Sequence, residues 1–168
     1  MLLIPFKAGP QWYALDAGET IEVVPFVSLR KIPRAPSFIA GVLDYHGKFV
    51  PVVDMGMLLC DTPSPAILST RIIIATCKPL NRDSGNDLVG LLARRILDTT
   101  TCSEKDLSSP CATAASAPCL GKLARTEKGL LQIVTTEEIL PESVRRTIFS
   151  SQSDIDSFPK EDLPGRAE

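Results

Sequence analysis

His46 is the only histidine in this chain of 168 residues, so any histidine-dependent chemistry has to be built around it. It lies in the tetrad Asp44-Tyr45-His46-Gly47, between two apolar runs, and the nearest acids in the sequence are Asp44 and Asp54. A Ser-His-Asp or Cys-His site would need this ring, with Asp44 as the residue that could orient it. A turn tip holds a base poorly to the roughly half-ångström accuracy that catalysis requires. We therefore expect His46 not to be a catalytic residue.

Metal and redox sites lack the ligands that they need. His46 and Asp44 offer two ligands where a metal site requires three or four in fixed geometry. The cysteines are widely and irregularly spaced, without a C-x-x-C pair: Cys60, Cys77, Cys102, Cys111 and Cys119. We expect them to be small buried apolar groups or surface thiols in a reducing compartment, and we expect no cofactor.

Other catalytic patterns are missing as well. The sequence has neither a G-x-x-x-x-G-K-[ST] loop nor a G-x-G-x-x-G loop, so phosphate binding has no support. The acid pairs Glu19/Glu22 and Glu137/Glu138 are interpreted as solvated side chains and a helix cap rather than a general acid and base. Phosphotransfer through His46 would need a helical surface that this sequence does not predict.

Composition places the chain among ordinary globular proteins. Hydrophobic residues make up 44% and charged residues 23%, and no apolar run reaches the roughly 18 residues that a membrane-spanning helix needs. The formal net charge of -2 gives no electrostatic basis for binding nucleic acid. We expect one domain over residues 1–149 that neither enters a membrane nor binds nucleic acid.

The elements that would position these side chains are mostly strands. Short segments rich in Val, Ile, Leu and Thr lie between frequent glycines and prolines, a pattern typical of a β-barrel or β-sandwich. The expected strands are Leu2–Lys7, Gln11–Asp16, Thr20–Pro25, Gly41–Tyr45, Lys48–Asp54, Arg71–Thr76, Asp87–Arg94 and Leu130–Val134.

The tetrad joins two of these strands in a predicted β-hairpin. Gly47 can adopt the positive φ that a two-residue turn requires. Pro51, in the returning strand, cannot donate a ladder hydrogen bond, which predicts an edge strand or a bulge there. Such an edge is either protected or pairs with another segment.

Helices and loops are expected mainly in the second half. Thr135 and Glu138 have capping-box spacing, and a C-terminal helix is predicted over Glu142–Phe149. Loops are expected over Cys60–Leu68, Lys78–Asn86 and Ser103–Pro118. The segment 150–168 is acidic and poor in apolar residues, which predicts a disordered tail.

The chain also resembles a known family over about residues 3–141. Its elements, in order, are Tyr13-Ala14-Leu15-Asp16, Glu22-Val23-Val24, Ile32-Pro33, Phe38-Ile39-Ala40-Gly41-Val42, Gly47, Pro51-Val52-Val53-Asp54 and Val89-Gly90-Leu91. Together they resemble the CheW-like domains of bacterial chemosensory arrays. The resemblance implies two small five-stranded SH3-like β-barrels around a shared hydrophobic core, with a short C-terminal helix.

The resemblance implies a function too. CheW-like proteins are non-catalytic cytoplasmic adaptors that couple a methyl-accepting chemoreceptor to a CheA-type histidine kinase, whose regulatory domain has the same fold. The candidate partner-binding residues are Glu22, Gly41, Asp44, Tyr45, His46, Gly47 and Lys48. A second interpretation stays open for the framework residues Gly41 and Gly47, and for Gly90, Pro33 and Pro51, which could serve only to shape turns and edges.

The tip departs from the family pattern. The family usually has Asn-x-Arg-Gly where this chain has Asp44-Tyr45-His46-Gly47, so a permanently charged, forked cation is replaced by an imidazole ring. This suggests an alternative chemosensory system, for example a surface-sensing one with cyclic dinucleotide output. A coupling protein of a pilus-motility or gene-regulatory pathway is the closest alternative; a fragment of a larger kinase and an enzyme using His46 or a cysteine are more distant ones.

Overall fold

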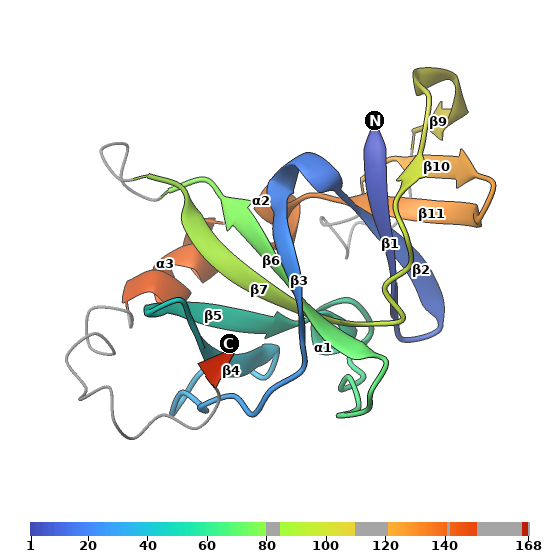
Figure 1. Ribbon diagram of the computed structural model, residues 1–168. Coiled ribbons are helices and arrows are strands. Elements are labelled where there is room, and N and C mark those ends of the chain that lie inside the picture. Colours follow the sequence, from blue (N-terminus) through green and yellow to red (C-terminus); the bar gives the residue numbers. More distant parts are fainter. Residues whose placement is uncertain (80–84, 110–120, 141, 151–165, 168) are drawn as a thin grey trace.

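The computed structural model describes residues 1–79, 85–109, 121–140, 142–150 and 166–167 (Figure 1). The strands of these residues form one continuous sheet, mixed but mainly antiparallel, that curls into two barrels. In Figure 1 the barrel with β3 to β7 lies on the left, and the barrel with β1, β2 and β9 to β11 on the right.

The first barrel contains β3 (Thr20–Pro25), β4 (Ile39–Tyr45), β5 (Lys48–Asp54), β6 (Thr70–Cys77) and β7 (Asp87–Arg94). They pair in the order β4-β5-β7-β6-β3. The chain leaving β3 returns to β4, where the backbones of Arg30 and Val42 exchange two hydrogen bonds of 3.1 and 2.8 Å. This bridge brings the two ends of the sheet together, as in an SH3-like barrel.

The second barrel contains β1 (Leu2–Ala8), β2 (Gln11–Asp16), β9 (Leu107–Ser108), β10 (Leu123–Thr126) and β11 (Gly129–Val134). Their order is β1-β2-β11-β10-β9, with β2 and β11 parallel. The short strand β8 (Thr100–Thr101) pairs with the start of β1. The pairing of Lys7 with Arg94 connects β1 to β7 and so links the two barrels.

The hydrophobic core has three parts, because successive side chains of a strand point to opposite faces of the sheet. On β6, Ile72 and Ile74 point into the first barrel, while Ile73 and Ala75 point into a larger core shared by both barrels. Leu3 and Leu131 fill the second barrel. Each fully buried aliphatic side chain of this size stabilises the fold by about 1.5–3 kcal/mol. The double barrel with its shared core is thus confirmed.

Three short helices close the shared core. α1 (Met55–Cys60) follows β5, α2 (Thr136–Ile139) follows β11, and α3 (Glu142–Ser150) is the helix expected near the C-terminus. Ile139, Leu140 and Ile148 are buried in the shared core. Thr135 accepts a hydrogen bond from the Glu138 amide at 3.3 Å, which is one half of the predicted capping box.

The eight expected strands are present, with bounds shifted by at most two residues. Other segments differ from expectation. The helix α1 was not predicted, and β10 lies in a segment with no expected element. The loop expected over Ser103–Pro118 is wrong at its start, where a 3-10 turn (Glu104–Asp106) and β9 follow each other. These elements are too short for a periodic pattern.

Pro51 lies in an internal strand, so the expectation of an edge strand is wrong. β5 has β4 on one side and β7 on the other. The pairing with β7 begins only at Val52, and Val42, opposite Pro51, directs its own backbone bonds to Arg30. The position of the missing proline N–H therefore faces away from β4, at a point where β5 does not yet pair with β7.

Parts of three sequence expectations lie outside the described residues. These are the middle of the loop 78–86, the loop from residue 110 to 118 and most of the tail 150–168. Within the tail the structure describes Arg166–Ala167 as β12, which pairs in parallel with β4. Cys111 and Cys119 also lie outside the described residues.

Candidate partner-binding site

The hairpin tip is a tight two-residue turn, as the sequence predicted. Tyr45 pairs with Lys48, and the two residues between them have positive φ, 51° at His46 and 81° at Gly47. This combination is typical of a type I′ turn, whose twist matches that of the flanking strands. The Asp44 carboxylate accepts a hydrogen bond from the Gly47 amide at 2.8 Å. Asp44 therefore fixes the turn.

Tyr45 ties the hairpin to the early strand β3. Its hydroxyl donates a hydrogen bond of 2.6 Å to Glu22 Oε2, and this bond, with partial burial and the negative charge of Glu22, raises the pKa of Tyr45. The two residues lie on opposite sides of the gap between β3 and β4, which the barrel brings together. The His46 ring packs edge-on against the Tyr45 ring at a centroid distance of 4.4 Å.

These contacts make one exposed corner of the first barrel. Glu22, His46, Gly47 and Lys48 are exposed, whereas only 9% of Tyr45 is accessible. We call Glu22 together with residues 44–48 the tip corner. It presents a carboxylate, an imidazole ring and an ammonium group within one small surface, held in place by the Tyr45 bond and the turn.

Gly41 is set apart from the tip corner. It lies further down β4, opposite Val52 and next to a bulge, and it is buried. Its φ is 149°, and a Cβ at this position would lie 2.5 Å from the Arg30 carbonyl oxygen. The close approach of the Arg30 segment thus requires glycine, which accounts for Gly41 as a framework residue. A role in partner contact stays a prediction.

In the described part of the chain, neither acid considered for His46 forms a hydrogen bond with its ring. Asp54, one of the two acids considered for it, is at the opposite end of β5 and buried. Its carboxylate caps α1 by accepting from the Gly56 amide at 2.9 Å, and it binds both the amide and the hydroxyl of Ser64 at 2.9 and 2.6 Å. Asp44 is engaged with Gly47. Among the residues that the structure describes, no three metal-ligating side chains converge.

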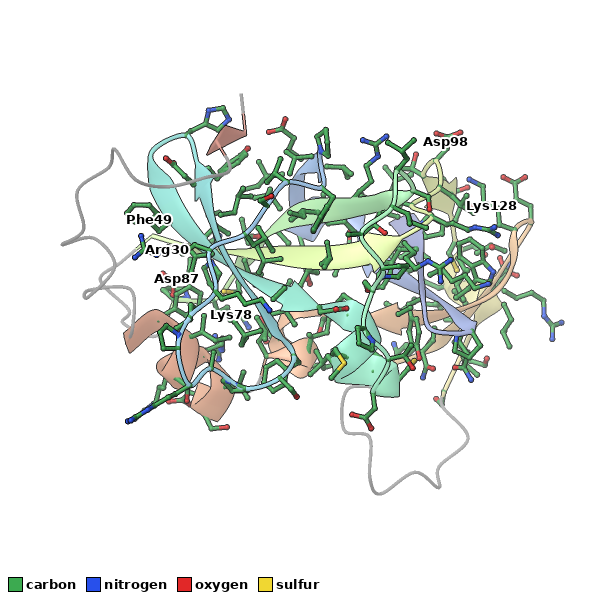
Figure 2. All side chains as sticks on the ribbon, turned by 90° about the horizontal axis from the view of Figure 1, so that it is seen from below. Arg30, Phe49, Lys78, Asp87, Asp98 and Lys128 are labelled. Atoms are coloured by element: carbon green, nitrogen blue, oxygen red, sulfur yellow. The ribbon has the colours of Figure 1, made fainter. Side chains whose placement is uncertain are left out.

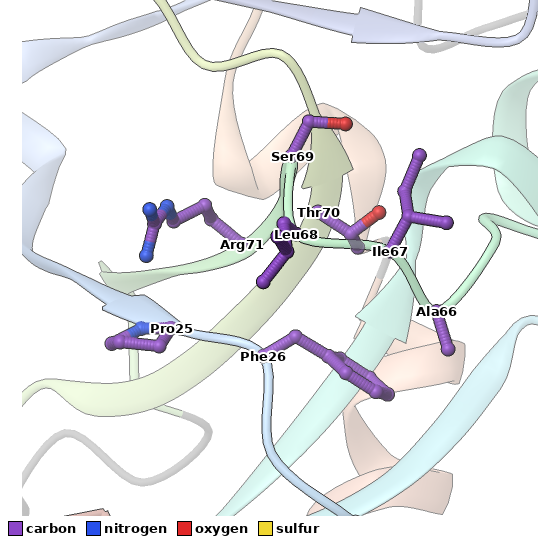
Figure 3. Close-up of a pocket in the computed structure, with 8 residues that line it drawn as sticks. All are labelled: Pro25, Phe26, Ala66, Ile67, Leu68, Ser69, Thr70 and Arg71. Atoms are coloured by element: carbon purple, nitrogen blue, oxygen red, sulfur yellow. The ribbon is translucent and has the colours of Figure 1, made fainter.

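Sequence reasoning missed an apolar groove on the same barrel. It has a volume of about 930 Å³ and lies between the end of β3 and the chain entering β6 (Figure 3). Phe26 and the exposed Ile67 and Leu68 line it, and Leu68 is 97% accessible. The adjacent apolar pair Ile67-Leu68 at the end of the loop expected over Cys60–Leu68 was the available signal. Exposed apolar side chains also continue along β3 at Ile21 and Val23.

The described cysteines are free and mostly buried. Burial raises the pKa of Cys77 to about 12, with the nearby Asp87 adding to the shift, so this thiol stays protonated and unreactive at neutral pH. Cys60 is half-buried, and its sulfur lies 3.9 Å from the Tyr13 hydroxyl. Burial, assisted by Cys60, raises the pKa of Tyr13 to about 12.

Away from the tip corner, two lysine side chains link loops to neighbouring segments. In Figure 2, Arg30, Phe49, Lys78 and Asp87 mark the end of the first barrel near α3, and Asp98 and Lys128 mark the far end of the second. Lys128 donates to the Asp98 carbonyl oxygen at 2.5 Å, and Lys78 forms an exposed ion pair with Glu137 at 2.7 Å. Exposed pairs of this kind contribute little to stability.

The fold and the tip corner together define a double β-barrel domain with an exposed, preorganised corner. The family model described as the CheW-like domain matches residues 3–144, so the chain belongs to the CheW-like family. The resemblance seen in the sequence is thereby confirmed.

Individual relatives agree with this assignment. The chain is 27% identical over 105 residues to the chemotaxis protein CheW of Rhizobium meliloti (strain 1021), a match that covers 62% of this chain and 63% of the relative. It is 23% identical over 103 residues to a probable chemotaxis protein CheW of Rhizobium etli, covering 61% and 62%. The matched regions thus span less than two thirds of either relative.

A solved structure has the same fold. The scaffolding protein TtCheW from Thermoanaerobacter tengcongensis superposes with a TM-score of 0.71, covering 83% of this chain and 92% of that protein, at 23% sequence identity. Within the described part of the present chain, no helix is long and apolar enough to cross a membrane.

Proposed function

We propose that this protein is a non-catalytic cytoplasmic adaptor that couples a methyl-accepting chemoreceptor to a CheA-type histidine kinase. Membership of the CheW-like family supports the class of function. The names of the relatives, chemotaxis and scaffolding proteins, point in the same direction.

The observation that carries the site is the bond between Tyr45 and Glu22 at 2.6 Å. It joins two segments that the sequence selected separately, the early strand and the hairpin tip. A binding surface gains affinity when its side chains are already held in the bound arrangement, because less conformational freedom is lost on association. The tip corner is preorganised in this sense.

The tip corner suits a protein partner by its chemistry. Glu22 and Lys48 can pair with charges of opposite sign, and the exposed His46 ring, packed edge-on against the buried Tyr45 ring, offers an aromatic surface. Aromatic residues surrounded by polar ones are typical of protein interfaces. We propose the CheW-like regulatory domain of the kinase and the cytoplasmic tip of the receptor as the partners. Nucleic acid stays an unexpected partner, given the net charge of -2.

Calorimetric titration tests this function. The purified protein is titrated with the regulatory domain of the CheA-type kinase from the same genome and, separately, with a soluble fragment of the receptor tip. His46→Ala and Glu22→Ala remove side chains of the tip corner. Arg125→Ala, an exposed side chain on β10 of the second barrel, serves as the matched control.

We expect saturable binding that weakens about tenfold or more in the two tip variants and stays unchanged in the control. Binding that is equal in all four proteins would keep the adaptor function and move the site away from the tip corner. Absence of binding to any kinase domain or receptor tip would overturn the proposed function.

The departure at His46 supports a more specific version of the proposal. A ring in place of the arginine that is usual in the family suggests partners from an alternative chemosensory system, including surface-sensing, pilus-motility or gene-regulatory ones. Parallel titrations with the kinase domains of each system in the genome test it. Tighter binding to the kinase of a flagellar chemotaxis system than to any other would contradict it.

A further inference from the structure

The outer edge of β4 beside the hairpin tip has backbone groups that need a partner. Val42 exchanges both of its backbone hydrogen bonds with Arg30, on the side of β4 that faces away from β5. Backbone groups alternate between the two sides of a strand, so the N–H and C=O of Asp44 face the same outer edge. Residues 26–29, which precede Arg30, form no strand that could continue this pairing along β4 toward Asp44.

The C-terminal strand β12 occupies that position. Arg166 lies opposite Asp44 and Ala167 opposite Tyr45, in a parallel arrangement. In Figure 1 the red strand at the C-terminus lies alongside β4. The end of the chain thus returns to two residues of the tip corner, and the open backbone of Asp44 is the group that it meets.

We propose that Arg166–Ala167 act as a resident strand: they close the β4 edge in cis, and an extended partner segment can take this edge only after they are released. Strand addition to a free sheet edge is a common way of binding an extended peptide. A segment already paired there excludes a second one, because each backbone group of Asp44 can serve one neighbouring strand. The identity of the competing partner rests on the proposed adaptor function; the occupation of the edge does not.

The length of β12 makes it suited to release. A two-residue strand forms only a few ladder hydrogen bonds, and holding it in place costs the conformational entropy of its residues. By contrast, β4 pairs with β5 along its whole length. The edge is therefore protected in the free protein without being permanently closed.

Amide hydrogen exchange measured by NMR tests the occupation directly. The full chain is compared with a chain that ends at Ser150 and with Ala167→Pro, which alters the strand itself. Ser153→Pro is the control for introducing a proline into the same tail. The Val42 amide, whose acceptor is the Arg30 carbonyl, is the internal reference in every sample.

We expect the Asp44 amide to exchange at least about tenfold faster in the shortened chain and in Ala167→Pro than in the full chain or Ser153→Pro, while Val42 is unchanged. Equal exchange at Asp44 in all four proteins would overturn the proposal. Protection of Asp44 that disappears on dilution, together with a dimer, would also overturn it, because the strand would then come from a second copy.

The competition is tested by titrating the full and shortened chains with the kinase regulatory domain. We expect the shortened chain to bind about three- to tenfold more tightly, since no resident strand has to be displaced. Equal affinities would overturn the competitive role. If neither chain bound, the adaptor function would fail, and hydrogen exchange at Asp44 would still decide whether β12 occupies the edge.

Discussion

The Tyr45 hydroxyl and the Glu22 carboxylate form a 2.6 Å hydrogen bond across the gap between β4 and β3. The backbone bonds between Arg30 and Val42 join the segment after β3 to β4, and this side-chain bond joins β3 itself to β4. It gives Glu22 a fixed position beside the turn. Two residues far apart in the sequence thereby become parts of one surface.

Replacing Tyr45 with Phe tests this link. Tyr45→Phe keeps the ring that packs on His46 and removes only the hydroxyl, so we expect the free energy of unfolding to fall by about 1 kcal/mol at neutral pH. Since the bond raises the pKa of Tyr45, its contribution is present below the ordinary tyrosine pKa of about 10 and is lost as the pH rises through the higher folded-state value. Urea denaturation of both proteins at pH 7 and above pH 10 measures the difference, which should shrink at alkaline pH. A constant difference would contradict the assignment.

The raised pKa of Tyr13, in the shared core, predicts a second loss of stability at alkaline pH. Its folded-state pKa of about 12 exceeds the unfolded value of 10.0, so the unfolded chain loses this proton first. Between these two pH values the free energy of unfolding should fall by about 2 kcal/mol in total because of this one group. Tyr13→Phe should show a smaller decrease over the same range. Cys77 contributes to both curves alike, so their difference isolates Tyr13; identical slopes would show that Tyr13 ionises normally in the folded protein.

The sequence predicted the parts of the fold that depend on local patterns. Alternating apolar residues located β6 and β7, and His46-Gly47 located the hairpin turn, because strand periodicity and positive φ are encoded within a few residues. Pro51 was located correctly in its strand, but its environment depends on where β5 begins to pair with β7, which is a tertiary property.

The parts that the sequence did not predict depend on distant contacts. The bond between Glu22 and Tyr45 exists because the barrel brings β3 beside β4, and neither residue carries a local signal of the other. The six residues of α1 are too few for an amphipathic pattern, and the helix begins where Asp54 caps it and binds Ser64, ten residues further along the chain. The family resemblance supplied the double barrel that periodicity alone left as a barrel or a sandwich.

Asp54→Ala should be strongly destabilising without altering the tip corner. The buried carboxylate accepts hydrogen bonds from the Gly56 amide and from the amide and hydroxyl of Ser64, and each of these donors would be left without its acceptor. We expect a loss of about 2–4 kcal/mol in the free energy of unfolding. Asp98→Ala, an exposed aspartate near the second barrel, is the control and should change stability by less than about 0.5 kcal/mol. Equal effects of the two substitutions in thermal denaturation would contradict the capping role.

Two glycines of the hairpin separate a framework role from a contact role. A Cβ at Gly41, where φ is 149°, would lie 2.5 Å from the Arg30 carbonyl oxygen, whereas a Cβ at Gly47, where φ is 81°, would meet no atom within 4 Å. Gly41→Ala should therefore cost about 3 kcal/mol of folding free energy, because backbone has to move, and Gly47→Ala only about 1–2 kcal/mol of backbone strain.

Chemical denaturation measures both losses of stability, and titration with the kinase regulatory domain follows at a temperature where both variants are folded. We expect Gly47→Ala, at the exposed tip, to weaken binding more than its stability loss explains, and Gly41→Ala to act through the fold. If Gly41→Ala remained as stable as the unaltered protein yet bound more weakly, Gly41 would be a contact residue and the framework interpretation would be wrong.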